Sequence, residues 1–217
     1  MRISKHLSIF DKEDDALAAI KRVLELKPDY APAWLMRAEL AAEDADGNFP
    51  ESDLRRALEL DPRLARAHLL LARYLGYGER RDEAQSALAR AIELDPQQAE
   101  AWSLRGEWQQ RAAVVGFGDA GGDDPEVVRT FSGQRLSRPA LLAARADFET
   151  SLGLKNDPRV RLRLARLLHD LGEFDAALAA YDAVLAVTPI DDPRRAAIVD
   201  MRAASENGGR GEHDEQK

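Results

Sequence analysis

The sequence predicts an all-α stack of helix-turn-helix repeats, and three observations support this fold class. A proline recurs at an interval of 34 residues, at Pro28, Pro62 and Pro96. A bulky ring residue keeps the same interval, at Trp34, His68 and Trp102. Between these markers, apolar residues follow the i, i+3, i+4 spacing that places them on one face of an amphipathic helix. A period of this length with two helices in each unit is typical of repeat proteins that stack into a solenoid.

Residues 65–98 show the repeat most clearly. Leu71 and Leu75 mark the first helix, and Leu88 and Ile92 mark the second, each pair at helical spacing. A polar turn joins the two helices, and a proline ends the second one because proline lacks an amide donor and restricts the residue before it.

The same pattern divides most of the chain into repeats. The other predicted repeats are residues 1–30, 31–64, 99–157 and 158–190. The first helix of the first repeat is about one turn short, because the chain starts inside it. An amphipathic helix over 191–204 is predicted to cap the stack, giving about eleven helices in one domain of residues 1–204. Residues 205–217 carry no apolar side chain that could dock, so we expect them to be disordered.

An insertion of about 26 residues interrupts the fourth repeat, at about residues 114–139. It is rich in glycine and aspartate, which favour turns over regular structure. We expect a mobile loop that the stack does not require, with one short helix opened by Asp124 and Pro125.

A 34-residue helix-turn-helix period resembles the tetratricopeptide repeat (TPR) family. The fifth repeat carries the family's small and large apolar positions, at Leu164, Ala165, Leu168, Gly172, Ala177, Tyr181, Val184 and Pro189. The resemblance implies a right-handed superhelical solenoid of about five TPR repeats with a C-terminal capping helix. The second repeat departs from the family at Arg37, where a large apolar residue is usual.

Composition and motif spacing argue against several classes of function. The net charge of −8 and pI near 5.1 argue against nucleic acid as a partner. The chain has no cysteine, its four histidines lack metal-ligand spacing, and no nucleophile–base motif stands out, so we expect no metal, no cofactor and no enzyme activity. Neither a secretory signal nor a run of 18 apolar residues is present, so we expect no membrane insertion and a cytoplasmic location.

The resemblance further implies that the first helix of each repeat lines a concave groove that binds a partner. Candidate groove residues fall into two sets along the chain. The N-terminal set is Leu35, Met36, Arg66, Leu69, Leu70 and Arg73. The C-terminal set is Leu104, Arg159, Leu162, Arg163 and Arg166. The last three arginines are spaced by four and three residues and share one helical face, which favours a ligand with acidic groups.

The sequence therefore predicts a non-catalytic scaffold or adaptor that binds a protein or peptide, with acidic groups, in its concave groove. Two alternatives stay open. One is an accessory domain or subunit of an enzyme or an assembly machinery, in which the insertion supplies the site. The other is a structural solenoid that associates with itself. The partner's identity and the oligomeric state do not follow from the sequence.

Overall fold

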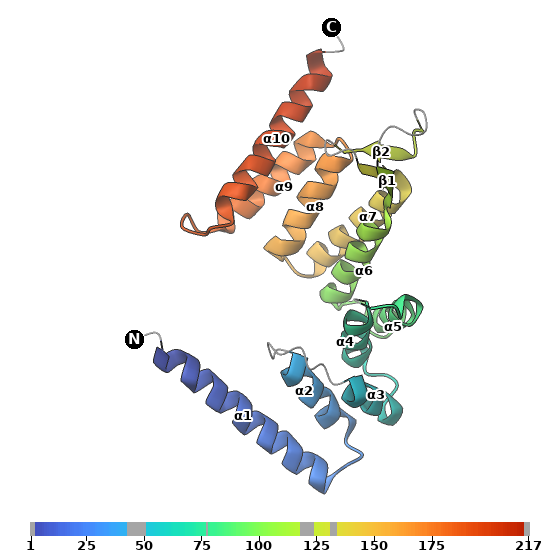
Figure 1. Cartoon of the computed structure of the whole chain (residues 1–217), viewed down its shortest axis with the longest axis vertical. Helices are drawn as coiled ribbons and strands as arrows, with labels where there is room; N and C mark the ends of the chain where they lie inside the picture. Colours follow the sequence, from blue (N-terminus) through green and yellow to red (C-terminus); the bar gives the residue numbers. More distant parts are fainter. Residues whose placement is uncertain (1–2, 43–50, 77, 118–123, 131–133, 215–217) are drawn as a thin grey trace. The chain divides into compact units, whose positions relative to one another are not determined.

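The computed structural model describes residues 3–42, 51–76, 78–117, 124–130 and 134–214. The chain divides into two compact units, Met1–Pro96 and Gln97–Lys217, and each is described on its own. Over the described residues there are ten helices and one small sheet (Figure 1). The predicted all-α repeat fold is confirmed.

The first unit contains five helices. They are α1 (Ile3–Leu26), α2 (Ala31–Ala42), α3 (Glu51–Leu60), α4 (Ala65–Leu75) and α5 (Arg81–Leu94). Helix α2 pairs with α3, and α4 pairs with α5. The prediction of two helices within residues 1–30 is wrong, because α1 is one continuous helix (Figure 1). Neither glycine nor proline interrupts its sequence, so nothing in the chain breaks it into two. The described helices therefore number one fewer than expected.

A hydrogen bond joins the recurring ring residue to the recurring proline. The Trp34 indole Nε1 donates a hydrogen bond of 2.9 Å to the carbonyl of Pro28. The His68 Nε2 makes the equivalent bond of 3.0 Å to the carbonyl of Pro62. Each ring thus satisfies a backbone oxygen at the junction with the preceding repeat, which explains why the two markers keep the same interval.

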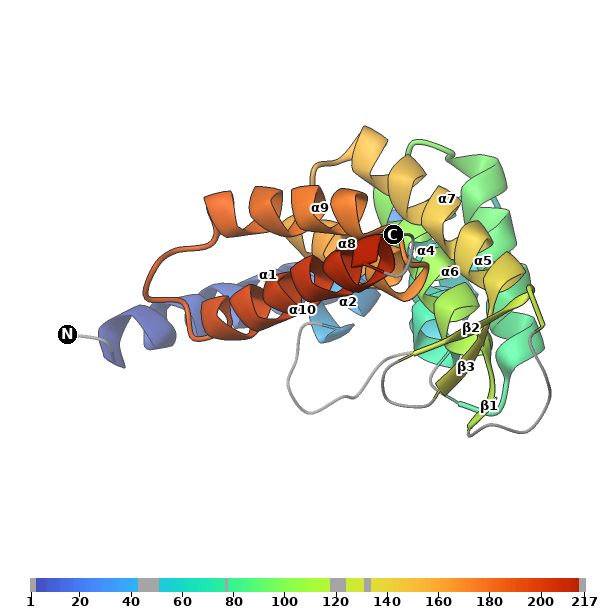
Figure 2. The ribbon, with the colours of Figure 1, turned by 90° about the horizontal axis from the view of Figure 1, so that it is seen from above.

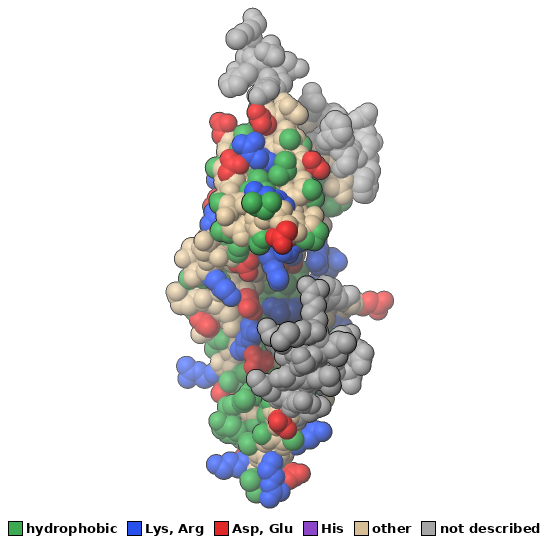
Figure 3. All heavy atoms as spheres, turned by 90° about the vertical axis from the view of Figure 1, so that its left-hand side faces the viewer, with side chains coloured by type: hydrophobic (Ala, Val, Ile, Leu, Met, Phe, Trp, Pro, Cys, Tyr) green, Lys and Arg blue, Asp and Glu red, His purple; other side chains and the backbone are tan. Residues whose placement is uncertain are grey.

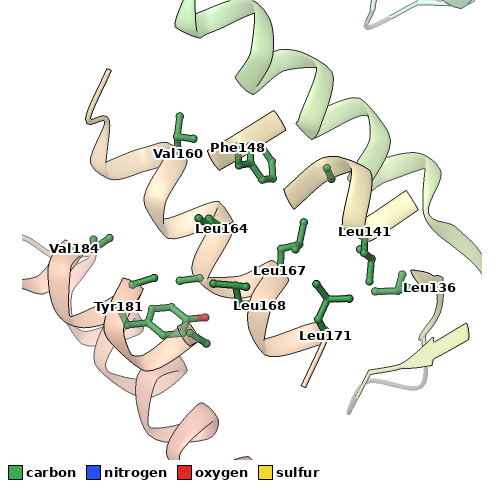
Figure 4. Close-up of a cluster of buried hydrophobic side chains, with 14 of the residues drawn as sticks. Leu136, Leu141, Phe148, Val160, Leu164, Leu167, Leu168, Leu171, Tyr181 and Val184 are labelled. Carbon is green, nitrogen blue, oxygen red and sulfur yellow. The ribbon is translucent and has the colours of Figure 1, made fainter. Parts of the chain in front are cut away.

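The second unit contains five further helices and the sheet. Its elements are α6 (Ala99–Ala112), β1 (Val114–Phe117), β2 (Val127–Arg129), β3 (Gln134–Ser137), α7 (Arg138–Leu154), α8 (Pro158–Asp170), α9 (Phe174–Val187) and α10 (Arg195–Asp214). Helices α8, α9 and α10 lie side by side, and the sheet lies beside α6 and α7 (Figure 2). A single apolar core joins these elements, with Phe148, Leu167 and Tyr181 almost completely buried within it (Figure 4).

The insertion forms a three-stranded antiparallel sheet with the order β1-β3-β2. Val128 pairs with Leu136 across two strands, and both side chains are buried in the core of the unit. Figure 4 shows Leu136 next to Leu141, at the start of α7. The prediction of a loop with a short helix is therefore wrong over the described residues 114–117, 124–130 and 134–137. The glycine- and aspartate-rich stretch obscured two short apolar segments that pair with each other.

Helix α10 runs ten residues beyond the predicted end of the cap, so the expected disorder from Ser205 onwards is wrong as far as Asp214. Ser205 is fully buried, and its Oγ lies 2.8 Å from Nδ1 of His169. Gly208 packs against Phe174 so closely that an added Cβ would lie 2.6 Å from the ring. Small residues allow this helix to pack closely against α8 and α9. A search of the sequence for apolar spacing does not detect such residues.

An ion pair between a partly exposed arginine and a buried aspartate occupies the same place in two repeats. Arg37 donates two hydrogen bonds of 2.6 Å to Asp53, and Arg105 donates bonds of 2.8 and 2.6 Å to Asp147. Both aspartates are nearly inaccessible, with exposed fractions of 5% and 3%. Each guanidinium also lies 4.6 Å from the ring centroid of the tryptophan three residues earlier. The aspartate explains why Arg37 is tolerated at a position that is usually apolar.

The intervening repeat has an apolar version of this contact. At the positions equivalent to the arginine and the aspartate it carries Leu71 and Ala87, both buried. Ionic and apolar contacts between paired helices thus alternate along the second, third and fourth repeats.

We expect Leu136→Ala to lower the free energy of unfolding by about 2–5 kcal/mol, because it removes a side chain from the core and leaves a cavity. Urea denaturation measures this loss. Leu142→Ala is the matched control, since Leu142 is 45% exposed on α7, and it should change the stability little. Equal losses for the two variants would mean that the sheet does not contribute to the core.

Arg105→Leu should lower the free energy of unfolding by about 3 kcal/mol, because it leaves the buried Asp147 carboxylate without its partner. Adding Asp147→Ala recreates the leucine–alanine contact of the third repeat and should recover most of the loss. Urea denaturation of both single variants and the double variant measures the coupling. If the double variant is no more stable than Arg105→Leu, the two repeat types are not interchangeable.

Candidate functional site

A cavity of about 600 Å³ opens in the first unit between α1, α2 and α4. Its described lining consists of Ala16, Ala19, Ile20, Met36, Glu39, Leu40, Arg66, Leu70 and Arg73. Four of the six residues predicted for the N-terminal set line it, namely Met36, Arg66, Leu70 and Arg73.

Helical spacing brings these groups to one cavity. Arg66, Leu70 and Arg73 are spaced by four and three residues on α4, so they share a face of that helix. Glu39 on α2 accepts a hydrogen bond of 2.9 Å from Nε of Arg66, and this pair holds the two helices together at the cavity. Met36 is 51% exposed on α2. The cavity therefore combines an apolar lining with charges of both signs.

The other two residues of the N-terminal set lie elsewhere. Leu69 is fully buried and does not line this cavity, so the prediction that it faces a groove is wrong. Leu35 is partly buried and does not line this cavity. Ala16 and Ile20 of α1 also line the cavity, although they are not among the groove residues predicted from the sequence. Their spacing of four residues on one face of α1 was the available signal.

The C-terminal set lies in the second unit, where its members have different surroundings. Leu104 is buried in the unit and is not a surface residue. Arg159 and Leu162 line a smaller cavity of about 240 Å³ beside Val184 and Val187 of α9.

The remaining two arginines contact groups of this same unit. Nη2 of Arg163 lies 3.2 Å from Oε1 of Glu107 on α6. Nε of Arg166 lies 3.0 Å from Sδ of Met201 on α10. The three arginines of α8 share a helix as predicted, but two of them already have partners within the unit. These contacts argue against the prediction that the arginines of α8 bind an acidic ligand.

Charged side chains of both signs are interspersed over the face in Figure 3. Within the described ranges, no three His, Cys, Asp or Glu side chains come together in a group that could hold a metal ion. None of the described helices has the length and apolar character needed to cross a membrane.

Comparison with known proteins supports the repeat assignment. The tetratricopeptide repeat family model matches residues 69–108 and 135–194. Between the two matched ranges lie the strands β1 and β2 of the insertion. A search of curated protein sequences finds no match.

Several solved structures share the fold at low sequence identity. PilF of Pseudomonas aeruginosa aligns with a TM-score of 0.63 and 20% identity over 96% of this chain and 86% of its own. YrrB, described as a TPR protein with an unusual peptide-binding site, aligns with a TM-score of 0.61 and 17% identity over 86% of this chain and 81% of its own. A thermophilic TPR protein from Thermus thermophilus aligns with a TM-score of 0.55 and 20% identity over 96% of both chains.

The paired helices, the 34-residue spacing and these matches define an α-helical repeat protein. The repeats over residues 69–108 and 135–194 are tetratricopeptide repeats, and the chain shares the fold of solved TPR proteins.

We expect Arg163→Glu to lower the free energy of unfolding by about 1 kcal/mol, because Glu107 would then face a second carboxylate in place of a cation. Adding Glu107→Arg should restore the pair and the stability. Arg159→Glu is the matched control on the same helix, and it should have little effect. If both single variants lose stability equally, net charge rather than the ion pair is responsible.

Proposed function

We propose that the protein is a non-catalytic scaffold whose first unit binds a segment of a partner protein in the cavity between α1, α2 and α4. The observation that carries this proposal is the convergence of four predicted groove residues on one cavity. A mostly apolar cavity of several hundred Å³ with a few polar groups has the size and composition of a ligand site. TPR proteins generally act as scaffolds, and YrrB is described as having a peptide-binding site.

The charges of the cavity favour a ligand that has an acidic group beside an apolar side chain. Among the described lining residues, two arginines outnumber one glutamate in a chain of net charge −8. The apolar side chain would contact Met36, Leu40 and Leu70. The acidic group would lie near the guanidinium groups of Arg66 and Arg73, which attract a carboxylate.

Selection from a library of random peptides displayed on phage tests this proposal with the intact chain. We expect the selected peptides to be enriched in acidic and large apolar residues, and their binding to weaken as salt is raised. Met36→Glu should abolish their binding, since it places a carboxylate in the apolar part of the cavity and repels the acidic group.

The matched control is Ala89→Glu, which adds the same charge at an exposed position of α5 outside the cavity. It should leave peptide binding unchanged. Peptides that bind both variants equally well would place the site elsewhere, and selected peptides without acidic residues would contradict the assigned ligand chemistry.

A further inference from the structure

A second cavity, of about 820 Å³, lies in the second unit where the sheet, the end of α8 and helix α10 meet. Its described lining consists of Val127, Val128, Thr130, Arg138, His169, Asp170, Leu171, Gly172, Phe174, Ala204, Asn207 and Gly208. The walls come from the insertion and from the extension of α10, which are the two parts of the unit that depart from the repeat pattern.

Asp170 gives this cavity a negative group. It is the last residue of α8, so the partial negative charge of the helix C-terminus adds to its carboxylate. It is partly buried, and no basic side chain of the described residues lies within ion-pair distance of it. Burial raises the pKa of the Asp170 carboxyl, although His169 and Arg166 act in the opposite direction. A cation that entered the cavity would lower the free-energy cost of keeping this carboxylate ionised while it is partly buried.

Two rings beside Asp170 are held in place. The rings of His169 and Phe174 meet edge to face, with centroids 5.5 Å apart and an interplanar angle of 73°. Gly208 packs against the ring edge formed by Cε1 and Cζ of Phe174, and any larger residue there would collide with the ring. The face of a phenylalanine ring attracts ammonium and guanidinium groups.

Ser205 holds the ring of His169 in place beside Asp170. The Oγ of Ser205 lies 2.8 Å from Nδ1 of His169 and 3.2 Å from the carbonyl oxygen of Met201. The Asp170 carboxylate supplies the acceptor for a donor group in the cavity.

Two arginines limit where a cation can bind. Arg138 lines the cavity from the start of α7, and Arg166 lies one turn before Asp170 with its Nε directed to Met201. A ligand cation is favoured beside the Asp170 carboxylate and disfavoured beside the Arg138 guanidinium. The volume of the cavity exceeds that of a single side chain, so it has room for a peptide segment that carries the cation.

We infer that this cavity is a second binding site, separate from the one in the first unit, and that it takes an arginine or lysine side chain from a segment of a partner protein. Asp170 pairs with the cation, the Phe174 ring contacts it, and the side chain of Asn207, which also lines the cavity, can bond the peptide backbone.

Titration of the full-length protein with acetyl-Gly-Arg-Gly-amide, followed by NMR of the His169 and Phe174 ring protons, tests this inference. We expect saturable shifts of both rings. Asp170→Asn should weaken the affinity about tenfold, since it replaces a charge-assisted pair by a neutral contact. Asp175→Asn, at an exposed carboxylate of α9 outside the cavity, is the matched control and should bind normally.

Two further probes distinguish other occupants. Acetyl-Gly-Glu-Gly-amide should not bind, and its binding in place of the arginine peptide would assign the cavity to an anion held by Arg138 and His169. Butylguanidinium should bind more weakly than the arginine peptide, and equal affinity would assign the site to a free small cation. An Asp170→Asn variant that binds normally, or no shift with any probe, would overturn the inference. Met36→Glu should not affect this binding, so failure of the first site leaves the second testable.

Discussion

Close approach of the two helices within each repeat is the constraint on which the rest of this structure depends. Ala38, Ala72 and Ala165 are fully buried at equivalent positions of the first helices. In the fourth repeat the same position is Gly106, where an added Cβ would lie 2.9 Å from the ring of Phe148. Interiors are packed to crystal-like density, so larger residues there would force the helices apart. Because the paired helices meet through these small residues, the outer face of each first helix remains able to line a cavity.

The alternation of ionic and apolar contacts makes the helix–helix contacts of neighbouring repeats chemically different. A repeat that pairs Arg37 with Asp53 cannot exchange helices with one that pairs Leu71 with Ala87 without burying an unpaired charge. Repeat proteins are exposed to such mispairing because their units are alike. The buried pairs therefore favour the correct partner even where they add little to the total stability, which is the role best established for buried polar groups.

The sequence predicted the features that depend on regular spacing. The proline and ring positions located the repeats, and the helical spacing on α4 brought Arg66, Leu70 and Arg73 to one cavity. It did not separate Leu69 from Leu70, because adjacent leucines fit the same pattern and both are buried, while only Leu70 lines the cavity. Contacts between residues that are far apart in the sequence could not be predicted either. Leu136 finds the core through pairing with Val128, and the docking of α10 depends on Gly208 and Ser205, which resemble linker residues.

The inserted sheet also separates two helices that must find each other along the chain. Helices α6 and α7 pack together, yet the segment between them is several times longer than the turn that joins α8 to α9. Each doubling of such a link adds about 0.6 kcal/mol to the entropy cost of closing it, and this cost is met before the contacts form. Helices joined by short turns therefore pair early during folding, whereas α6 and α7 pair late. Until they do, Leu141 and Phe148 lack their partners, so the fourth repeat is the part of the unit that is longest at risk of aggregation while the chain folds.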